Sequence, residues 1–496
     1  MHVNIYKYIY IYLYCMEVNC PVEPGRKEKI QSSTDNWIIR KKMNKKRFMS
    51  LVLTAVIAGS TFAGCTNEEK PVNTNVTTNS NEPSANSGTA DEPEKKSKPS
   101  GNLLDKVTAA EVNTDLSEEQ LGKLNEASAD WSLNLLRKCY KEDGGDSFVS
   151  PLSIELALSM TANGAANKTL EQMVTTMAGE NCDINTLNAY LKRYTDSLEN
   201  DNWAKLEIAN AIWTNETRNV IPGEDFLKNV KGAFDAGVYS EPFETPALDN
   251  INKFCKEKTD GQIEKVLEDI DPGAIMYLVN ALNFEAKWAD QYADYQVSKS
   301  MFTEENGNQT EMDMLFSTEN EYLCNDFCYG VKKRYESGYS FVALLPNEGE
   351  TVSDLLEKMD GNAWMNMVNN PITAYDVDTK IPKFEKDSSY SLGDILQDMG
   401  MKDAFNENDA DFSNMIEPAA DIGNIYISHV IHKAHIELTE SGTKAAAVTV
   451  VEMTEAAAYE PEVKERKEVY LDRPFVYAIV DNENNLPIFI GTFDKP

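Results

Sequence analysis

Three histidines lie close together near the C-terminal end of this chain of 496 residues: His429, His432 and His435. Imidazole is well suited both to binding a metal ion and to carrying a proton, so this group is the first candidate for chemistry. In a strand, however, alternate side chains point to opposite faces, so His432 would face away from the other two. The three rings would not converge on one ion, and we predict neither a metal site nor a cofactor here.

Residues for other kinds of chemistry are absent or wrongly spaced. No Gly-x-Ser-x-Gly motif occurs, and apart from His2 no further histidine is left for a catalytic triad. Residues 165–169 lack the glycines of a phosphate-binding loop. Cys324 and Cys328 have no second cysteine pair or nearby histidine, which a structural zinc site would need. We therefore predict that the protein is not an enzyme.

An unusual stretch follows the histidines: residues 445–451 contain no charge, glycine, proline or aromatic ring. A soluble protein rarely leaves such a run without a partner strand. In extended form one face would carry only small uncharged side chains, namely Thr443, Ala445, Ala447, Thr449 and Val451. The opposite face would carry Lys444, Ala446, Val448, Val450 and Glu452. The stretch can therefore enter a sheet with its first face buried and its second face in water.

Strand-like segments flank this stretch, over residues 432–440 before it and 470–479 after it. The order of strand, Glu-x-Gly-Thr hinge, alanine-rich run, variable loop and strand resembles the serpins, inhibitors that trap proteases by inserting a loop. The resemblance covers about residues 115–496. It also rests on motifs at residues 148–154, 210–213, 251–263, 278–288, 341–346 and 381–384.

The resemblance implies an α+β serpin fold. Its parts would be a large, mostly antiparallel central sheet, further sheets, about eight or nine helices, and an exposed reactive loop near the C-terminus. Local signals agree with the helices. Ser117-Glu-Glu-Gln120 and Thr169-Leu-Glu-Gln172 have the pattern of capping boxes, and Ser150-Pro151 is typical of a helix start.

The resemblance also implies a mechanical function. A serine protease would attack the loop and form a covalent acyl-enzyme. The freed loop, residues 443–456, would then insert between two parallel strands and distort the attached protease. The family's spacing from Glu440 places the cleaved bond between Ala456 and Ala457, and the small alanine suggests an elastase-like or subtilisin-like target. Cleavage after Met453, Thr454, Ala458 or Tyr459 stays open.

Other functions remain possible for the same sequence. One is a non-inhibitory serpin-fold binding protein that proteases cleave as a plain substrate, and another is an inhibitor of cysteine proteases. A third is a solute-binding lipoprotein with two α/β lobes, which the order of the motifs does not support. The uncharged inserting face between Thr443 and Val451 favours the inhibitor of serine proteases.

Three groups of residues would control insertion if the resemblance holds. The loop hinge would consist of Glu440, Gly442, Thr443, Ala445, Ala446 and Ala447. A group that we call the shutter, whose hydrogen bonds close the sheet, would consist of Ser150, Ser153, Asn280 and His432. A group that we call the breach, where the loop enters, would consist of Trp288, Lys383 and Glu440, with an ion pair between Glu440 and Lys383.

The N-terminal part of the chain differs from the rest. Residues 1–42 look like upstream sequence translated from a start codon placed too early, and residues 43–64 have the charged and apolar regions of a signal peptide. Small residues followed by Cys65 resemble a bacterial lipoprotein signal, which implies a lipid anchor on Cys65. Residues 65–113 are polar and rich in proline, which predicts a disordered tether. The serpin domain would span residues 114–496.

The formal net charge of −34 argues against a nucleic-acid partner, which needs a basic surface. We expect an exported protein, either extracellular or held at the cell surface by its lipid anchor. Its expected partner is a serine protease bound in a covalent acyl complex. No other membrane contact is expected, and the protein should be a monomer.

Overall fold

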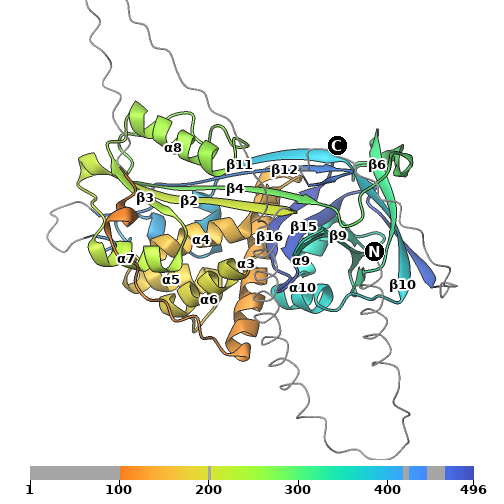
Figure 1. The fold of residues 1–496 in the computed structure, drawn as a ribbon, viewed down its shortest axis with the longest axis horizontal. Helices are drawn as coiled ribbons and strands as arrows, with labels where there is room; N and C mark the ends of the chain where they lie inside the picture. The colour runs from red at the N-terminus through yellow and green to blue at the C-terminus, as the bar shows by residue number, and fades with distance from the viewer. Residues whose placement is uncertain (1–100, 199–202, 417–423, 444–463) are drawn as a thin grey trace, which may run out of the picture. The chain divides into compact units, whose positions relative to one another are not determined.

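The computed structural model describes residues 101–198, 203–416, 424–443 and 464–496, coloured in Figure 1. The predicted upstream extension, signal peptide, lipidation site Cys65 and most of the tether lie outside the described residues. The same holds for loop residues 444–463, which include Ala445, Ala446, Ala447 and the predicted reactive bond Ala456–Ala457.

Nine α-helices occur in the described part, in agreement with the expected number. Most of them lie on one side of the central sheet, and α8 lies across the other side (Figure 1). Their bounds are α3 Glu118–Asp143, α4 Pro151–Ala162, α5 Asn167–Ala178, α6 Ile184–Ser197, α7 Glu224–Ala233, α8 Thr245–Lys258, α9 Val352–Lys358, α10 Gly361–Val368 and α11 Gly393–Met399. Short 3₁₀ helices are η1 Leu103–Lys106, η2 Glu216–Arg218, η3 Asp294–Gln296 and η4 Asp403–Phe405.

Two of the three predicted helix starts are confirmed. Ser117 and Gln120 form a reciprocal capping box at the start of α3. Ser150 caps α4, whose first residue is Pro151. The capping box predicted at Thr169 is wrong, because α5 already begins at Asn167 and the buried Thr169 hydroxyl accepts a hydrogen bond from the backbone N–H of Asp411 instead.

The central sheet has six strands in the order β11-β12-β13-β4-β2-β3. The strands are β2 Ala204–Asn215, β3 Gly237–Glu241, β4 Met276–Lys287, β11 Phe384–Ser391, β12 His429–Thr439 and β13 Gly442–Thr443. Neighbours are mostly antiparallel, as expected, whereas β12 with β4 and β2 with β3 are parallel.

Two further sheets complete the α+β fold. One has the order β1-β16-β15-β9-β8-β7, and the other has the order β14-β10-β6-β5. The strands of the first are β1 Phe148–Val149, β7 Tyr322–Cys324, β8 Cys328–Arg334, β9 Tyr339–Pro346, β15 Phe475–Asp481 and β16 Pro487–Phe493. Those of the second are β5 Val297–Thr303, β6 Gln309–Glu319, β10 Tyr375–Pro382 and β14 Glu465–Tyr470.

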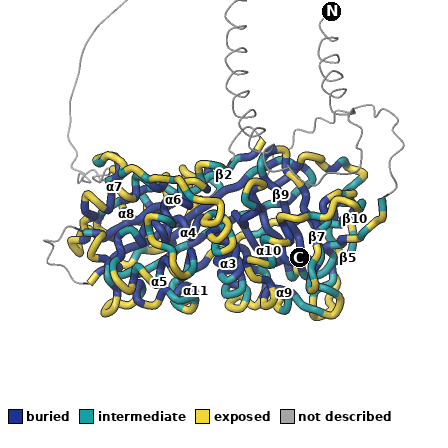
Figure 2. The backbone as a smooth tube through the Cα atoms, turned by 90° about the horizontal axis from the view of Figure 1, so that it is seen from below, coloured by how far each residue is buried: buried dark blue, intermediate teal, exposed yellow. Residues whose placement is uncertain are grey.

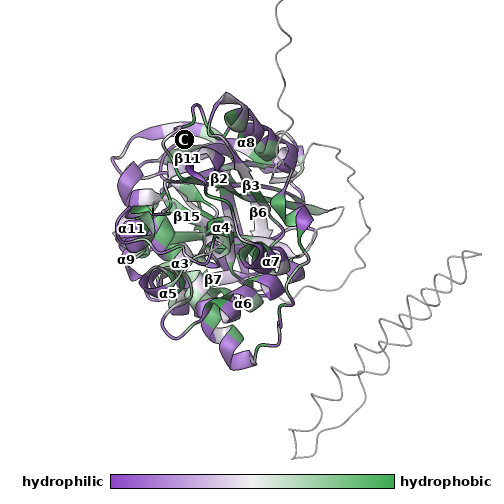
Figure 3. Cartoon of the chain, turned by 90° about the vertical axis from the view of Figure 1, so that its left-hand side faces the viewer, coloured by the Kyte–Doolittle hydropathy of each residue, from purple (hydrophilic) through white to green (hydrophobic). Residues whose placement is uncertain are grey.

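The central sheet is covered on both faces. Its inner face packs on α4, all of whose residues are buried, in the main hydrophobic core (Figure 2). On the outer face, Val279 and Ala281 of β4 pack against Ile251 and Cys255 of α8 in a second, smaller core. Figure 3 shows the corresponding hydropathy, with hydrophobic residues on α4 and β15 inside and hydrophilic residues on the exposed side of α8.

The first described residues pack against the domain although we assigned them to the tether. Leu104 in η1 is buried. The Lys231 ammonium in α7 donates hydrogen bonds to the backbone carbonyls of Leu104 and Val107, at 2.8 and 2.9 Å. Ordered contacts with the domain therefore begin before the predicted boundary at residue 114. Within the described residues, no helix has the length and apolar character needed to cross a membrane.

Candidate functional site: a sheet parted at one end

The hinge predicted from the sequence already lies inside the central sheet. Gly442 and Thr443 form β13, which pairs antiparallel with both β12 and β4. Thr443 lies opposite Leu438 on one side and Ala286 on the other, and it is buried. The backbone φ of Gly442 is +148°, and a Cβ atom there would come within 2.0 Å of the Ala286 carbonyl oxygen. A residue other than glycine would therefore not fit at this position.

The sheet is parted only at this end. At the other end β12 and β4 pair directly in parallel, from His429 opposite Tyr277 to Ala434 opposite Leu282. Between Ala434 and Leu438 the two strands separate to accept β13. β13 thus lies between two strands that are parallel to each other, at the end where they separate, and we call the space between these strands the slot.

The predicted breach residues meet at the open end. The Lys383 ammonium lies 2.6 Å from the Glu440 carboxylate, and this hydrogen bond lowers the pKa of Glu440. Trp288 is fully buried below them, and its indole N–H donates to the Thr439 carbonyl oxygen at 2.9 Å. All three residues therefore hold the turn that leads from β12 into the hinge.

Three further residues near the breach, Tyr335, Lys333 and Tyr292, were not found from the sequence. The Tyr335 ring stacks on Trp288 with 4.3 Å between centroids, and its hydroxyl lies 2.6 Å from the Thr443 hydroxyl. The buried Lys333 ammonium lies 4.7 Å from the centroid of the Tyr292 ring and pairs with Glu319 at 2.7 Å. No spacing signal marks these residues, because they come from β8, the segment after it and the loop after β4, all far from the hinge in sequence.

The predicted shutter residues form one buried hydrogen-bonded group where β12 and β4 are still paired. The ring Nε2 of His432 accepts from the Ser150 backbone N–H at 3.1 Å, so its Nδ1 carries the proton. That Nδ1–H donates to Asn280 Oδ1 at 2.6 Å. The Asn280 amide nitrogen donates to the side-chain oxygens of Ser153 and Asn210. Asn210 was not predicted as a member of this group, although residues 210–213 were predicted as part of a strand.

Burial keeps the shutter histidine neutral. Desolvation lowers the pKa of His432 from 6.5 to about 3, and its neighbours in the group are uncharged. The expected alternation along β12 is confirmed, since His432 is buried while His429 and His435 on the opposite face are partly exposed. A neutral, fully hydrogen-bonded group can close the sheet without placing a charge in the core.

One expectation about the slot needs correction. The sequence suggested that the second face of the inserted strand would lie in water. In the structure, α8 and the hydrophobic layer beneath it cover the outer face of β4, where Val279 and Ala281 are buried. The outer-face residues of β12 are partly exposed along the whole strand, so the slot is covered mainly on its β4 side.

This fold and this slot define a class of protein. A family model described as "Serpin (serine protease inhibitor)" matches residues 126–496. The chain therefore belongs to the serpin family, whose members are typically protease inhibitors and include non-inhibitory proteins.

Individual relatives agree with the assignment. The solved native-state structure of tengpin, a thermophilic serpin, is 38% identical, covers 80% of this chain and all of its own, and has a TM-score of 0.74. The leukocyte elastase inhibitor of Xenopus laevis is 28% identical over 75% of this chain and 99% of its own length. Thyroxine-binding globulin in complex with thyroxine is 26% identical, with a TM-score of 0.66 over 75% of this chain and 99% of its own.

Proposed function

We propose that the protein is a suicide-substrate inhibitor of extracellular serine proteases, which inserts residues 443–456 into its central sheet after cleavage. The observation that carries this proposal is the position of Gly442 and Thr443 between β12 and β4. Insertion would extend this two-residue strand, whose partners are Leu438 and Thr439 on one side and Ala286 and Lys287 on the other.

If the pairing of β13 with β12 and β4 continued along the loop, each loop residue would have one expected partner on either strand. Lys444 would lie between Glu437 of β12 and Glu285 of β4, where two carboxylates complement its charge. Thr449 would lie between His432 and Asn280, so that its hydroxyl could take part in the shutter hydrogen bonds. β12 would pair with residues 442–452 and β4 with residues 442–453, so both strands offer a slot of nearly the same length.

The side chains of the loop match the two faces of that slot. Thr443, Ala445, Ala447, Thr449 and Val451 would join the inner core beside Leu438, Ile436 and Ala434. On the outer face the apolar Ala446, Val448 and Val450 would approach the layer under α8, with the charges of Lys444 and Glu452 at its two ends. Insertion would therefore bury no charge in the middle of the sheet.

The geometry also sets how far the target would move. A strand from residue 443 to residue 456 spans about 46 Å at about 3.3 Å per residue. A protease esterified to Ala456 would be carried from the hinge end of the slot past its shutter end. Since the inserted strand gains ladder hydrogen bonds and buried area, the uncleaved form would be metastable and protected by a kinetic barrier.

A protease panel tests the proposal. The purified chain is mixed with an elastase-type, a subtilisin-type and a cysteine protease, and adducts are analysed by denaturing electrophoresis and mass spectrometry. We expect an SDS-stable adduct with a protease of small primary pocket, and a released peptide that begins at Ala457. The similarity to a leukocyte elastase inhibitor supports this choice of target. Cleavage without any adduct would instead support a non-inhibitory binding protein.

We propose further that the chain is exported as a monomer and anchored through lipid on Cys65. The support is the sequence of residues 43–65 alone. In a bacterial host, wild-type protein should fractionate with membranes and Cys65→Ala should not. Membrane association of the alanine variant would contradict the anchor while leaving the inhibitory proposal intact.

A further inference from the structure

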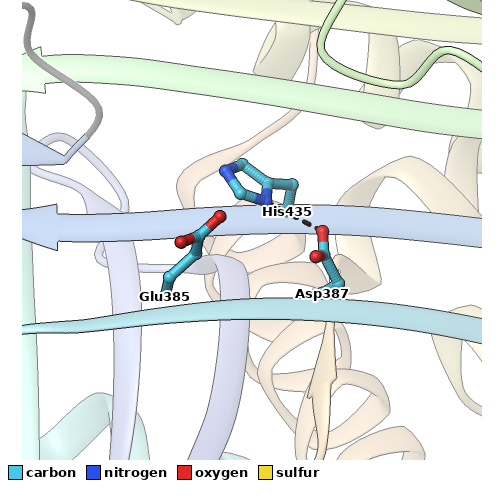
Figure 4. A group of neighbouring side chains, drawn as sticks. All are labelled: Glu385, Asp387 and His435. Carbon is cyan, nitrogen blue, oxygen red and sulfur yellow. Dashed lines mark hydrogen bonds and ion pairs between the residues drawn. The ribbon is translucent and has the colours of Figure 1, made fainter.

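A second group of ionisable side chains lies on the central sheet, away from the breach and the shutter. The antiparallel pairing of β11 with β12 places Asp387 opposite His435 and Glu385 opposite Glu437, all on one face. Donor atoms of Glu385, Asp387 and His435 all lie within 4.8 Å of one another. Figure 4 shows the imidazole of β12 between the two carboxylates of β11.

The charges of this group are not balanced by the protein. Glu385 and Glu437 are directly opposed carboxylates, an arrangement that destabilises a strand pair. Asp387 Oδ1 accepts a hydrogen bond of 2.8 Å from the Nδ1–H of His435. Among the described residues, neither Glu385 nor Glu437 forms an ion pair. The Glu385 and Asp387 carboxylates therefore share a single imidazole.

The nearby lysines are all engaged elsewhere. Lys383 pairs with Glu440, and Lys386 points to the other face, where it lies 3.0 Å from the Asp146 carboxylate. Lys433 is on the same face as His435, but its ammonium donates to the Lys265 backbone carbonyl at 2.7 Å. Within the part of the chain that the structure describes, no lysine ammonium forms an ion pair with Glu385 or Asp387.

We propose that Glu385, Asp387 and His435 form a binding site for a divalent transition-metal ion of the zinc class, which links β11 to β12. One imidazole nitrogen and two carboxylate oxygens match the ligands that such ions prefer, with water completing the coordination. Both carboxylates are exposed, so rotation of their side chains can bring them to the usual zinc–oxygen distances of about 2.0–2.2 Å.

The surroundings leave room for the ion and its water. A hollow of about 370 Å³ opens beside Asp387 and His435, with residues 262–265, which follow α8, on its other side. The site differs from the group of three histidines considered in the sequence, because only His435 takes part and its partners come from β11. It is also independent of protease inhibition, since neither the hinge nor the shutter contributes a ligand.

Cobalt titration tests the site without interference from the cysteines. The chelator-treated full-length protein is titrated with Co²⁺ and followed by absorption spectroscopy, because thiolate ligands add a charge-transfer band that nitrogen and oxygen ligands lack. Zn²⁺ is then added as a competitor. We expect one cobalt site without the thiolate band, displaced by Zn²⁺, and a higher melting temperature in the presence of Zn²⁺.

Matched variants decide where the ion binds. His435→Gln and Asp387→Asn should each weaken binding by more than about tenfold, since even indirect metal partners often contribute that much. His429→Gln, on the same face of the same strand, should leave binding unchanged. Equal binding in wild type and both ligand variants would overturn the proposal. A titration in which every bound cobalt ion shows the thiolate band would overturn it as well. If His435→Gln does not fold, Asp387→Asn decides alone, because the Asp387 side chain is 82% exposed.

Discussion

The two ends of the slot are held by different kinds of interaction. At the hinge end, the Glu440 and Lys383 side chains that form the ion pair are 39% and 30% exposed. At the shutter end, His432, Asn280, Ser150 and Ser153 are all fully buried and joined by hydrogen bonds. One end is therefore held by screened charge and aromatic packing, and the other by desolvated polar groups.

The difference indicates where the barrier to insertion lies. A surface ion pair contributes little and is weakened by salt, so the hinge end can part at low cost. Buried polar groups lose their full hydrogen-bonding energy when separated, because no water is there to replace the lost partner. Parting the sheet beyond Ala434 must break such bonds, so we expect the shutter to oppose insertion more strongly than the hinge end does.

The largest effect should come from blocking the slot itself. Thr443→Arg places a charge where the threonine hydroxyl now contacts Tyr335 in a buried site. We expect loss of the protease adduct while loop cleavage continues, measured by electrophoresis after incubation with the target protease. Thr443→Ser keeps the hydroxyl and should form the adduct normally. Continued trapping by the arginine variant would argue against insertion at this position.

Cutting the loop tests the metastability that both ends maintain. An inserted strand facing the 11 residues of β12 would add about 15–20 hydrogen bonds at roughly 0.5–1.5 kcal/mol each, or on the order of 10 kcal/mol. The melting temperature should therefore rise by about 10 °C or more after cleavage, as measured by calorimetry. An unchanged melting temperature would mean that the cut loop stays outside the sheet.

Removing one shutter side chain should weaken the closed end. Asn280→Ala takes away the acceptor of the His432 N–H and the donor to Asn210. We therefore expect the free energy of unfolding of the native state to fall by about 3 kcal/mol. Denaturant unfolding measures this loss. Asn283→Ala on the same strand, whose amide donates to Glu207 on the outer face, is the matched control and should cost less.

Acid should open the shutter end selectively. The pKa of His432 is about 3 in the folded protein and about 6.5 when unfolded, so the unfolded chain binds the extra proton between these values. Its contribution to stability is complete above pH 6.5 and is lost as the pH falls toward 3. At pH 4.5 the loss should be about 2–3 kcal/mol. Other buried acids, such as Glu155, contribute the same pH dependence to wild type and to His432→Gln. The difference in stability between the two proteins therefore reports on His432 alone.

The smallest effect is expected at the hinge ion pair. Lys383→Met should lower the stability by less than about 1 kcal/mol, because both charges are partly in water. The difference from wild type should vanish in high salt when unfolding is measured by denaturant. A loss as large as that of Asn280→Ala would show that the two ends do not differ as we infer.

Much of the fold and of the site follows from short sequence patterns. The alternation along β12 determines that His432 points inward and His435 outward, because side chains in a strand alternate in any fold. Gly442 and the small residues after it indicate a strand that can enter a crowded sheet. Ser117 and Ser150 mark helix starts because their hydroxyls bond to backbone groups only a few residues away. All these signals are local.

Only the tertiary structure decided which distant residues meet. Tyr335 reaches Thr443 across 108 positions of sequence, and Asn210 joins Asn280 across 70, with no spacing rule to predict either contact. The position of α8 decides which part of the slot's outer face is dry, and the pairing of β11 with β12 brings Glu385 and Asp387 to His435. Sequence periodicity fixes the face on which a side chain lies, whereas the packing of strands and helices far apart in the chain fixes its neighbours.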